Sequence, residues 1–206
     1  MKIYVVGSSK NKFLPLDNIR EKFLIDQKHE GDNIDFLNPW YCELTGLYYL
    51  WKHCDDDIVG LEHYRRYFVN NRNKLLSEGE INDILKDNDV IVCEIDLRNI
   101  ALKQFEESEG RPNKVNLFSI MANSPTELVS VIKQRLFTNK LISNNIFICK
   151  KEIIAEYCEY FFNAIKDITL NDENKRIIGF LSEYIFGAWL IYKRYRINRK
   201  KVIFVK

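Results

Sequence analysis

One uninterrupted apolar run limits this chain to a small set of folds. Residues 90–93 read Val-Ile-Val-Cys, with no polar side chain among them. A strand with one solvated face alternates apolar and polar residues, whereas a strand covered on both faces is apolar at every position. The run therefore predicts a parallel or mixed sheet that carries helices on both of its faces.

Predicted strands and helices alternate along the rest of the chain, which is typical of the α/β class. Ser77 and Glu80 have the spacing of a capping box at the start of a helix. Asn38 followed by Pro39 is expected to begin another helix, as N-cap and first helical residue. Strands are predicted at residues 2–6, 58–61, 90–93, 145–149 and 202–205, and helices at residues 39–53, 77–87, 124–136, 151–168 and 181–192.

One long segment, residues 96–123, shows no convincing periodicity and includes Gly110, Arg111 and Pro112. A structureless connection of this length is uncommon in a compact domain, so we expect either a mobile functional loop or an unrecognised helix there. The chain has 206 residues, of which 46% are hydrophobic. That is enough to bury a core, and residues 1–206 are expected to form one domain.

Charge and cysteine content exclude several classes of function. The net charge of +2 provides no strong field for nucleic acid, so no nucleic-acid partner is expected. Five cysteines are scattered without a CxxC pair, which favours a reducing compartment. The first apolar run is too short for a signal peptide, and no window is long enough to span a membrane. We therefore expect a cytoplasmic protein.

The strand at residues 58–61 continues without a turn residue into Glu62-His63-Tyr64-Arg65-Arg66. Ligands of open α/β sheets bind at the carboxyl ends of strands. Arginine can capture phosphate with two hydrogen bonds, and two arginines can offset the charge of a diphosphate. If the strand alternates through Tyr64, then Glu62, Tyr64 and Arg66 share one face, and His63 and Arg65 share the other. The alternative is an exposed strand end whose arginines pair with surface acids.

Two further segments could contribute to a site. Gly7 and Ser8 follow the first strand, where a bare backbone could approach a nucleotide, although an ordinary turn explains them equally well. Glu183 is expected in the first turn of the helix at residues 181–192. It could act there as a general base, or it could be a favourable charge at a helix N-terminus.

A metal site is not expected. His53, Cys54 and His63 do not follow a zinc-binding spacing, although His63 could still ligate a metal, donate a hydrogen bond or titrate near neutrality. Three aspartates at residues 55–57 precede their strand, and a solvated turn is expected there.

Near the C-terminus a basic run could contact anionic lipid head groups, or it could be a solvated helix end. The run consists of Lys193, Arg194, Arg196, Arg199, Lys200 and Lys201.

Several blocks of residues resemble the domain of unknown function 4422 family, whose members occur in bacterial capsule, exopolysaccharide and lipopolysaccharide gene clusters and are regarded as glycosyltransferases. Together the blocks cover about a third of the chain, in the order in which the family has them. The matching blocks are Gly31-Asp32-Asn33-Ile34, Asn38 with Tyr41-Cys42-Glu43-Leu44-Thr45, Gly60-Leu61 with His63 to Phe68, Asn145 with Phe147-Ile148, and Gly179-Phe180 with Ser182-Glu183.

The sequence departs from the family pattern at four places. Ser8-Ser9 stands where the family has a histidine followed by lysine, and His53 replaces the asparagine of Trp-Lys-Asn. Ile146 replaces a methionine, and Tyr184 replaces an arginine. The chain is also shorter than typical members and its segment at 96–121 matches weakly, so the acceptor side is the least transferable part.

The resemblance implies a GT-A-like nucleotide-sugar fold, with a donor-side half at residues 1–95 and an acceptor-side half at residues 96–206. GT-A enzymes hold a divalent metal on an Asp-x-Asp at a strand end, where this chain has His63, Arg65 and Arg66 instead. We expect these three residues to stabilise the leaving diphosphate, with no cofactor required and a divalent metal as the less favoured alternative. Glu183 would be the base if the enzyme inverts. The residues expected to bind substrate are Gly7, Ser8, Asn33, Asn38, Glu43, Glu62, Tyr64 and Asn145.

The implied partners are a nucleotide-sugar donor, with a sugar of galactose or galactofuranose type, and a glycan or lipid-linked glycan acceptor. The main alternative is a non-catalytic subunit that binds a sugar nucleotide or a glycan within an assembly system. A third possibility is a phosphoesterase or nucleic-acid-binding module that uses the arginine pair, against which the near-neutral charge counts.

Overall fold

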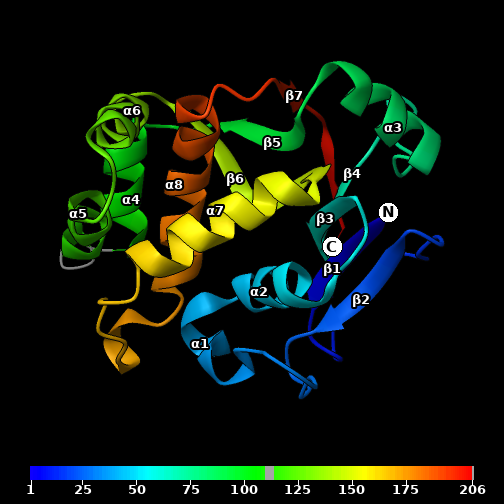
Figure 1. Cartoon of the computed structure of the whole chain (residues 1–206), viewed down its shortest axis with the longest axis horizontal. Coiled ribbons are helices and arrows are strands. Elements are labelled where there is room, and N and C mark those ends of the chain that lie inside the picture. The colour runs from blue at the N-terminus through cyan, green and yellow to red at the C-terminus, as the bar shows by residue number, and fades with distance from the viewer. Residues whose placement is uncertain (110–113, 206) are drawn as a thin grey trace.

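An eight-stranded mixed sheet organises the computed structural model, which describes residues 1–109 and 114–205 (Figure 1). The strands run in the order β2-β1-β3-β6-β5-β7, and β4, which lies off this path, pairs with both β3 and β8. Their bounds are β1 (Lys2–Gly7), β2 (Arg20–Leu24), β3 (Ile58–His63), β4 (Arg66–Phe68), β5 (Val90–Asp96), β6 (Lys140–Lys150), β7 (Ile197–Arg199) and β8 (Val202–Phe204).

Strand directions place the ends of three strands at one edge of the sheet. β1 is parallel to both β2 and β3, whereas β6 is antiparallel to β3 and β5. Val6 near the end of β1 is the partner of His63 at the end of β3. The residues that follow β1, β2 and β3 therefore lie along the same carboxyl edge.

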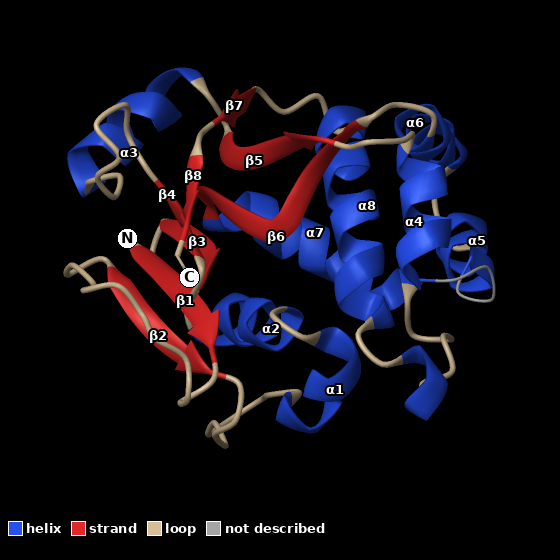
Figure 2. Cartoon of the chain, turned by 180° about the vertical axis from the view of Figure 1, so that it is seen from behind, coloured by secondary structure: helices blue, strands red, loops and turns tan. Residues whose placement is uncertain are grey.

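Helices cover both faces of this sheet, as the apolar run at residues 90–93 predicts (Figure 2). Ile91 packs in a smaller core with Ile81 and Leu85 of α3, whereas Val90 and Val92 face a larger core formed with α2, α7 and α8. The helices are α1 (Asn38–Tyr41), α2 (Leu44–His53), α3 (Glu78–Asp87), α4 (Ala101–Glu109), α5 (Lys114–Ala122), α6 (Thr126–Leu136), α7 (Lys151–Ala164) and α8 (Ile177–Tyr192).

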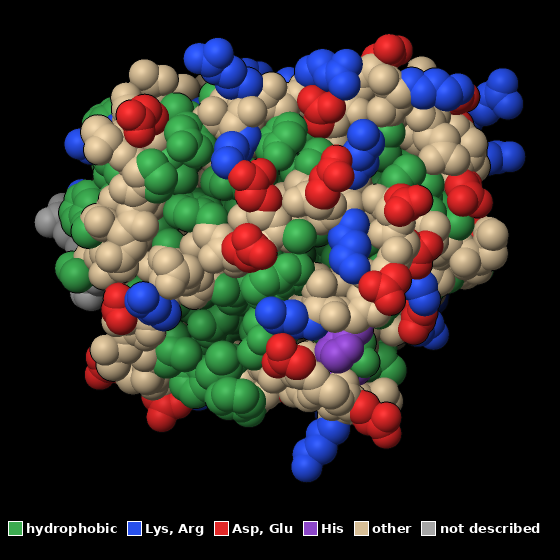
Figure 3. Space-filling view, viewed as in Figure 1, with side chains coloured by type: hydrophobic (Ala, Val, Ile, Leu, Met, Phe, Trp, Pro, Cys, Tyr) green, Lys and Arg blue, Asp and Glu red, His purple; other side chains and the backbone are tan. Residues whose placement is uncertain are grey.

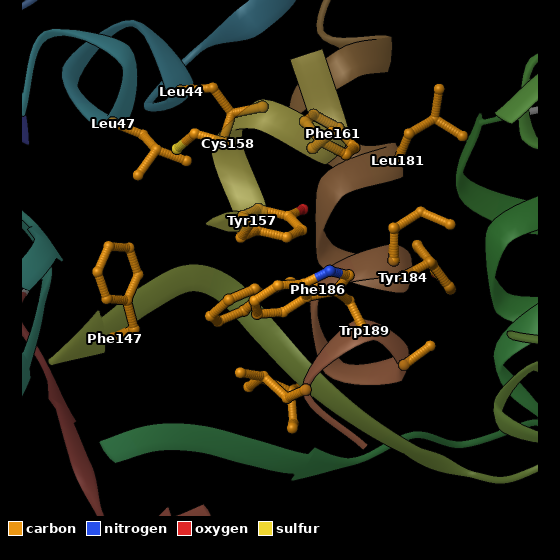
Figure 4. Packing of buried hydrophobic residues seen from close by; sticks show 14 of the residues in the cluster. Leu44, Leu47, Phe147, Tyr157, Cys158, Phe161, Leu181, Tyr184, Phe186 and Trp189 are labelled. Carbon is orange, nitrogen blue, oxygen red and sulfur yellow. The ribbon is translucent and has the colours of Figure 1, made fainter. Parts of the chain in front are cut away.

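The larger core is centred on α8, which is apolar around most of its circumference and accordingly buried. Tyr157 of α7 lies against Phe186 and Trp189 of α8, with ring centroids 4.8 Å and 5.3 Å apart (Figure 4). The Tyr157 hydroxyl shares a hydrogen bond with Ser182, so the polar end of this buried ring is satisfied. This packing fixes α8 against the sheet and thereby fixes the position of Glu183.

Two local predictions differ from the structure, and a third, which left two alternatives open, is decided by it. The helix expected at residues 39–53 is divided in two, because Cys42 has a positive φ of 52° that an α-helix cannot contain. Asn38 is not its N-cap, since α1 begins at Asn38 with Leu37 before it. Residues 96–123 contain the unrecognised helix rather than a loop, in fact the two helices α4 and α5, while Gly110, Arg111 and Pro112 lie outside the described residues.

On the face that carries α7, acidic and basic side chains are interspersed with apolar ones (Figure 3), in keeping with the small net charge. In the basic run near the C-terminus, three side chains form ion pairs with carboxylates. These pairs are Lys193 with Glu156, Arg196 with Asp89 at 2.9 Å, and Arg199 with Glu94 at 2.9 Å. A lipid contact through this run would depend mainly on its other three basic residues, Arg194, Lys200 and Lys201.

Within the described part of the chain, none of the helices combines the length and apolarity needed to cross a membrane.

Candidate functional site

The turn between β3 and β4 places two arginines at the carboxyl edge of the sheet. β3 ends at His63, and β4 starts three residues later at Arg66, which is the cross-strand partner of His63. The backbone N–H of Arg65 donates to Nδ1 of His63 over 3.3 Å. Cross-strand partners point to the same face, so His63 and Arg66 lie together.

The guanidinium of Arg66 is partly buried beside that of Arg65. Burial and the positive charge of Arg65 both lower the pKa of Arg66. The carboxylates of Glu183 and Glu43 act in the opposite direction from a distance. Among the residues that the structure describes, no carboxylate forms an ion pair with Arg65 or Arg66. The alternative in which surface acids neutralise these arginines therefore finds no support, and their charge is available to an anion.

Burial, followed by the charges of Arg66, Arg65 and Arg176, lowers the pKa of His63 from 6.5 to about 3. His63 is consequently neutral at physiological pH and can take part in hydrogen bonds without adding a charge. An anion between the arginines would oppose their field and raise the pKa of His63.

His63 should make the stability of the protein depend on pH. Between about pH 6.5 and pH 3 the unfolded chain binds a proton at this residue and the folded protein does not, so stability falls as the pH falls through that range. We expect the melting temperature of His63→Gln to fall less between pH 6.5 and pH 4 than that of the wild type. His53→Gln is the matched control, because His53 is exposed at the end of α2.

Equal slopes for the wild type and His63→Gln would contradict this assignment. A second measurement follows the His63 ring by NMR as inorganic pyrophosphate is added. We expect its titration to move upward in pH when the anion binds, because the anion offsets the three positive charges.

A kink in β6 brings two asparagines towards the same edge. Val92 pairs with Phe147 and Glu94 pairs with Ile142, so residues 143–146 form a bulge in the ladder. Asn144 and Asn145 within it have positive φ angles of 68° and 51°, a conformation that asparagine tolerates better than most residues.

Asn145 links the bulge to the break between α1 and α2. Its Nδ2 donates to Oε1 of Glu43 over 2.8 Å and to the carbonyl of Gly179 over 2.9 Å. Its Oδ1 is buried without a hydrogen-bond partner among the described residues, and so is Oδ1 of Asn38. Burial raises the pKa of Glu43, and the hydrogen bond from Asn145 opposes that effect.

Glu183 lies in the second turn of α8, because this helix begins at Ile177 rather than near residue 181. A favourable charge at the helix N-terminus therefore does not explain it. Its Oε2 accepts the backbone N–H of Asn144 over 2.6 Å. Glu183 and Glu43 line one small pocket together with Cys42, Arg176, Gly179 and Phe180.

Arg176 belongs to this group, although no sequence pattern predicted a role for it. It precedes α8 with a φ of 68°, and its backbone N–H donates to the carbonyl of Pro39 over 2.8 Å. Its guanidinium lies 4.7 Å from the ring centroid of Phe180. The only signal in the sequence is its place three residues before the matched Gly179-Phe180 block.

Glu62 is the predicted site residue that the structure places elsewhere. It is fully buried and its Oε2 accepts from Nε of Arg20 over 2.8 Å, in the interior of the protein. Its Oε1 accepts the backbone N–H of Phe68 over 2.9 Å, which ties β4 to β3. We therefore assign Glu62 a structural role rather than contact with substrate.

Close packing explains why a glycine stands at position 7, against Tyr64. A Cβ added to Gly7 would lie 2.8 Å from the ring of Phe13 and 2.9 Å from Cβ of Tyr64, so the absence of a side chain lets both residues approach. The backbone N–H of Tyr64 donates to the carbonyl of Val6, which extends the pairing of β1 with β3. Both residues are at the carboxyl edge, beside the arginines.

Ser8 and Asn33 lie in the two loops that follow β1 and β2. Ser8 donates its backbone N–H to Oδ1 of Asn11 over 2.6 Å, as in an ordinary turn. Asn33 donates its Nδ2 to the carbonyl of His29 over 2.8 Å. A cavity of about 420 Å³ lies beside Asn33 and is lined by residues 25–29, Asp35 and the exposed Phe36.

Comparison with known proteins agrees with this fold. The model of a domain of unknown function, DUF4422, matches residues 2–194. The chain is also similar to the solved apo structure of WbbM, a bifunctional glycosyltransferase, with a TM-score of 0.84 and 22% sequence identity. That match covers 100% of this chain and 45% of the other, so the chain spans less than half of the length of WbbM. No curated protein matches the sequence. The predicted α/β fold, with a mixed sheet flanked by helices, is confirmed.

Proposed function

The chain belongs to the domain of unknown function family DUF4422, and on this premise we propose that it is a glycosyltransferase with a nucleoside-diphosphate sugar as donor. One observation carries the proposal: Arg65 and Arg66 lie at the carboxyl edge of β3 without a carboxylate partner among the described residues. A diphosphate is the kind of anion that two adjacent guanidiniums bind. The fold shared with a bifunctional glycosyltransferase adds support.

In the proposed reaction the bond between the anomeric carbon and the diphosphate oxygen breaks while an acceptor hydroxyl forms a new bond to that carbon. The leaving diphosphate gains negative charge, which Arg65 and Arg66 stabilise in the transition state. Neutral His63 contributes a hydrogen bond. These cations take the place that a divalent metal has in other enzymes of this type, so the proposed reaction requires no metal.

The proton of the acceptor hydroxyl passes to a carboxylate if the reaction inverts the anomeric centre. We assign this role to Glu183, which shares a pocket with Glu43 and Arg176. The unpartnered Oδ1 atoms of Asn38 and Asn145 are acceptors of the kind that sugar hydroxyls satisfy. The cavity after β2, with Asn33 and the exposed ring of Phe36, would hold the nucleoside.

The donor sugar in this proposal is of galactose or galactofuranose type, and the acceptor is a surface polysaccharide or lipid-linked glycan assembled at the cytoplasmic side of the membrane. A panel of nucleotide sugars tested by thermal shift identifies the donor, because a ligand that binds only the folded protein raises its melting temperature.

Glu183→Gln is expected to bind that donor as tightly as the wild type does and to lose turnover by about 10²–10⁴-fold. The amide still accepts the N–H of Asn144 but cannot take a proton. Glu127→Gln, on the exposed side of α6, is the matched control and should keep full activity.

Donor binding without turnover by the wild type would favour the non-catalytic alternative. Activity is also measured with EDTA present. Complete loss of turnover that manganese restores would show that the arginines do not replace a metal.

A further inference from the structure

The ring of Phe204 in β8 lies beside both arginines of the candidate site. Its centroid is 5.3 Å from Cζ of Arg66 and 5.6 Å from Cζ of Arg65. Phe204 is nonetheless 56% exposed, so burial in the core does not account for a phenylalanine here. Both distances are within the range in which a guanidinium is attracted to the face of an aromatic ring.

Strand pairing fixes this arrangement. His63 is the partner of Arg66, and Arg66 is in turn the partner of Phe204, so the three side chains form a row on one face of β3, β4 and β8. The backbone N–H of Val205 donates to the carbonyl of Arg65 over 2.9 Å. β8 therefore holds both the turn and the side chains that project from it.

An aromatic ring suits a pair of anion-binding arginines better than a carboxylate would. Two adjacent guanidiniums repel each other, and Nε of Arg65 is buried without a hydrogen-bond partner among the described residues. A carboxylate would relieve the repulsion by occupying the N–H donors and cancelling the charge. The ring attracts both cations through its face and leaves their charge and donors available to a ligand.

We propose that Phe204 is a positioning residue that holds Arg65 and Arg66 in place for the diphosphate of the donor. The inference rests on the proposed function, and it extends the site to a strand beyond the family match, which ends at residue 194.

The test measures the affinity of inorganic pyrophosphate by calorimetry at fixed salt and pH. Phe204→Leu keeps an apolar side chain but removes the aromatic face, and we expect its affinity to fall roughly five- to thirtyfold. Phe204→Tyr and Phe204→Trp keep the face and should bind like the wild type. Phe137→Leu removes a ring of similar exposure, 66%, that has no guanidinium among its described contacts, and should leave the affinity unchanged.

The possible outcomes separate this inference from the proposed function. Equal affinity of the wild type and Phe204→Leu overturns the positioning role and leaves the proposed diphosphate site standing. A loss in Phe204→Leu that neither aromatic variant rescues also overturns it, since the ring face would not be the cause. A wild type that does not bind pyrophosphate overturns both proposals.

Discussion

Replacing Arg66 with alanine should weaken diphosphate binding strongly and leave the folded protein at least as stable as before. A hydrogen bond to a charged group contributes about 1.5–3 kcal/mol, so the affinity for pyrophosphate should fall roughly 10- to 150-fold. Turnover should fall by about 10²–10³-fold, as expected when a preorganised donor to the developing charge is removed. The melting temperature should not fall, because burial and the neighbouring charge of Arg65 both disfavour the charged form of Arg66 in the folded protein.

Two companion variants make the Arg66 result interpretable. Arg66→Lys keeps the charge but loses the planar pair of donors, so its affinity should lie between those of the wild type and Arg66→Ala. Arg72→Ala removes an exposed arginine in the loop after β4 and should change neither affinity nor stability. Wild-type affinity in Arg66→Ala would show that the arginine pair is not the anion site.

The elements that the sequence predicted correctly are those determined by local patterns. The apolar run at residues 90–93 does form a strand between two cores. Ser77 and Glu80 make both reciprocal hydrogen bonds of the capping box. The short strands β2, β4 and β7 were missed, because three to five residues with polar side chains carry little periodic signal.

The faces of the site residues could not be predicted, because the chain turns where the alternation pattern continues. Alternation placed Arg66 with Glu62 and Tyr64, as if β3 ran straight on. Instead a tight turn at Tyr64 and Arg65 brings Arg66 opposite His63 and leaves Glu62 facing the interior. Contacts between segments far apart in the sequence could not be predicted either, such as the hydrogen bond from Asn145 to Glu43. No local pattern encodes such pairs.

Breaking the buried pair of Glu62 and Arg20 should destabilise the protein strongly. Both side chains are fully buried, with 2.8 Å between Nε of Arg20 and Oε2 of Glu62. Arg20→Met leaves the Glu62 carboxylate without a compensating charge in the interior, so it should lower the free energy of unfolding by about 3–5 kcal/mol. Glu62→Leu should cost less, because Asp17 still pairs with Arg20 over 2.7 Å. Urea denaturation of each variant measures the change in the free energy of unfolding.

The double variant Glu62→Leu/Arg20→Met tests whether the loss comes from the unpaired charge. We expect it to recover a large part of the stability lost in either single variant, because no charge then stays buried without a partner. Recovery should be incomplete, since the backbone N–H of Phe68 and the carbonyl of Leu76 lose the side chains that now satisfy them. Single variants within about 1 kcal/mol of the wild type would contradict the assignment. The double variant should still bind pyrophosphate if Glu62 supports the turn without touching the ligand. Loss of binding in a stably folded double variant would indicate that Glu62 contacts the ligand.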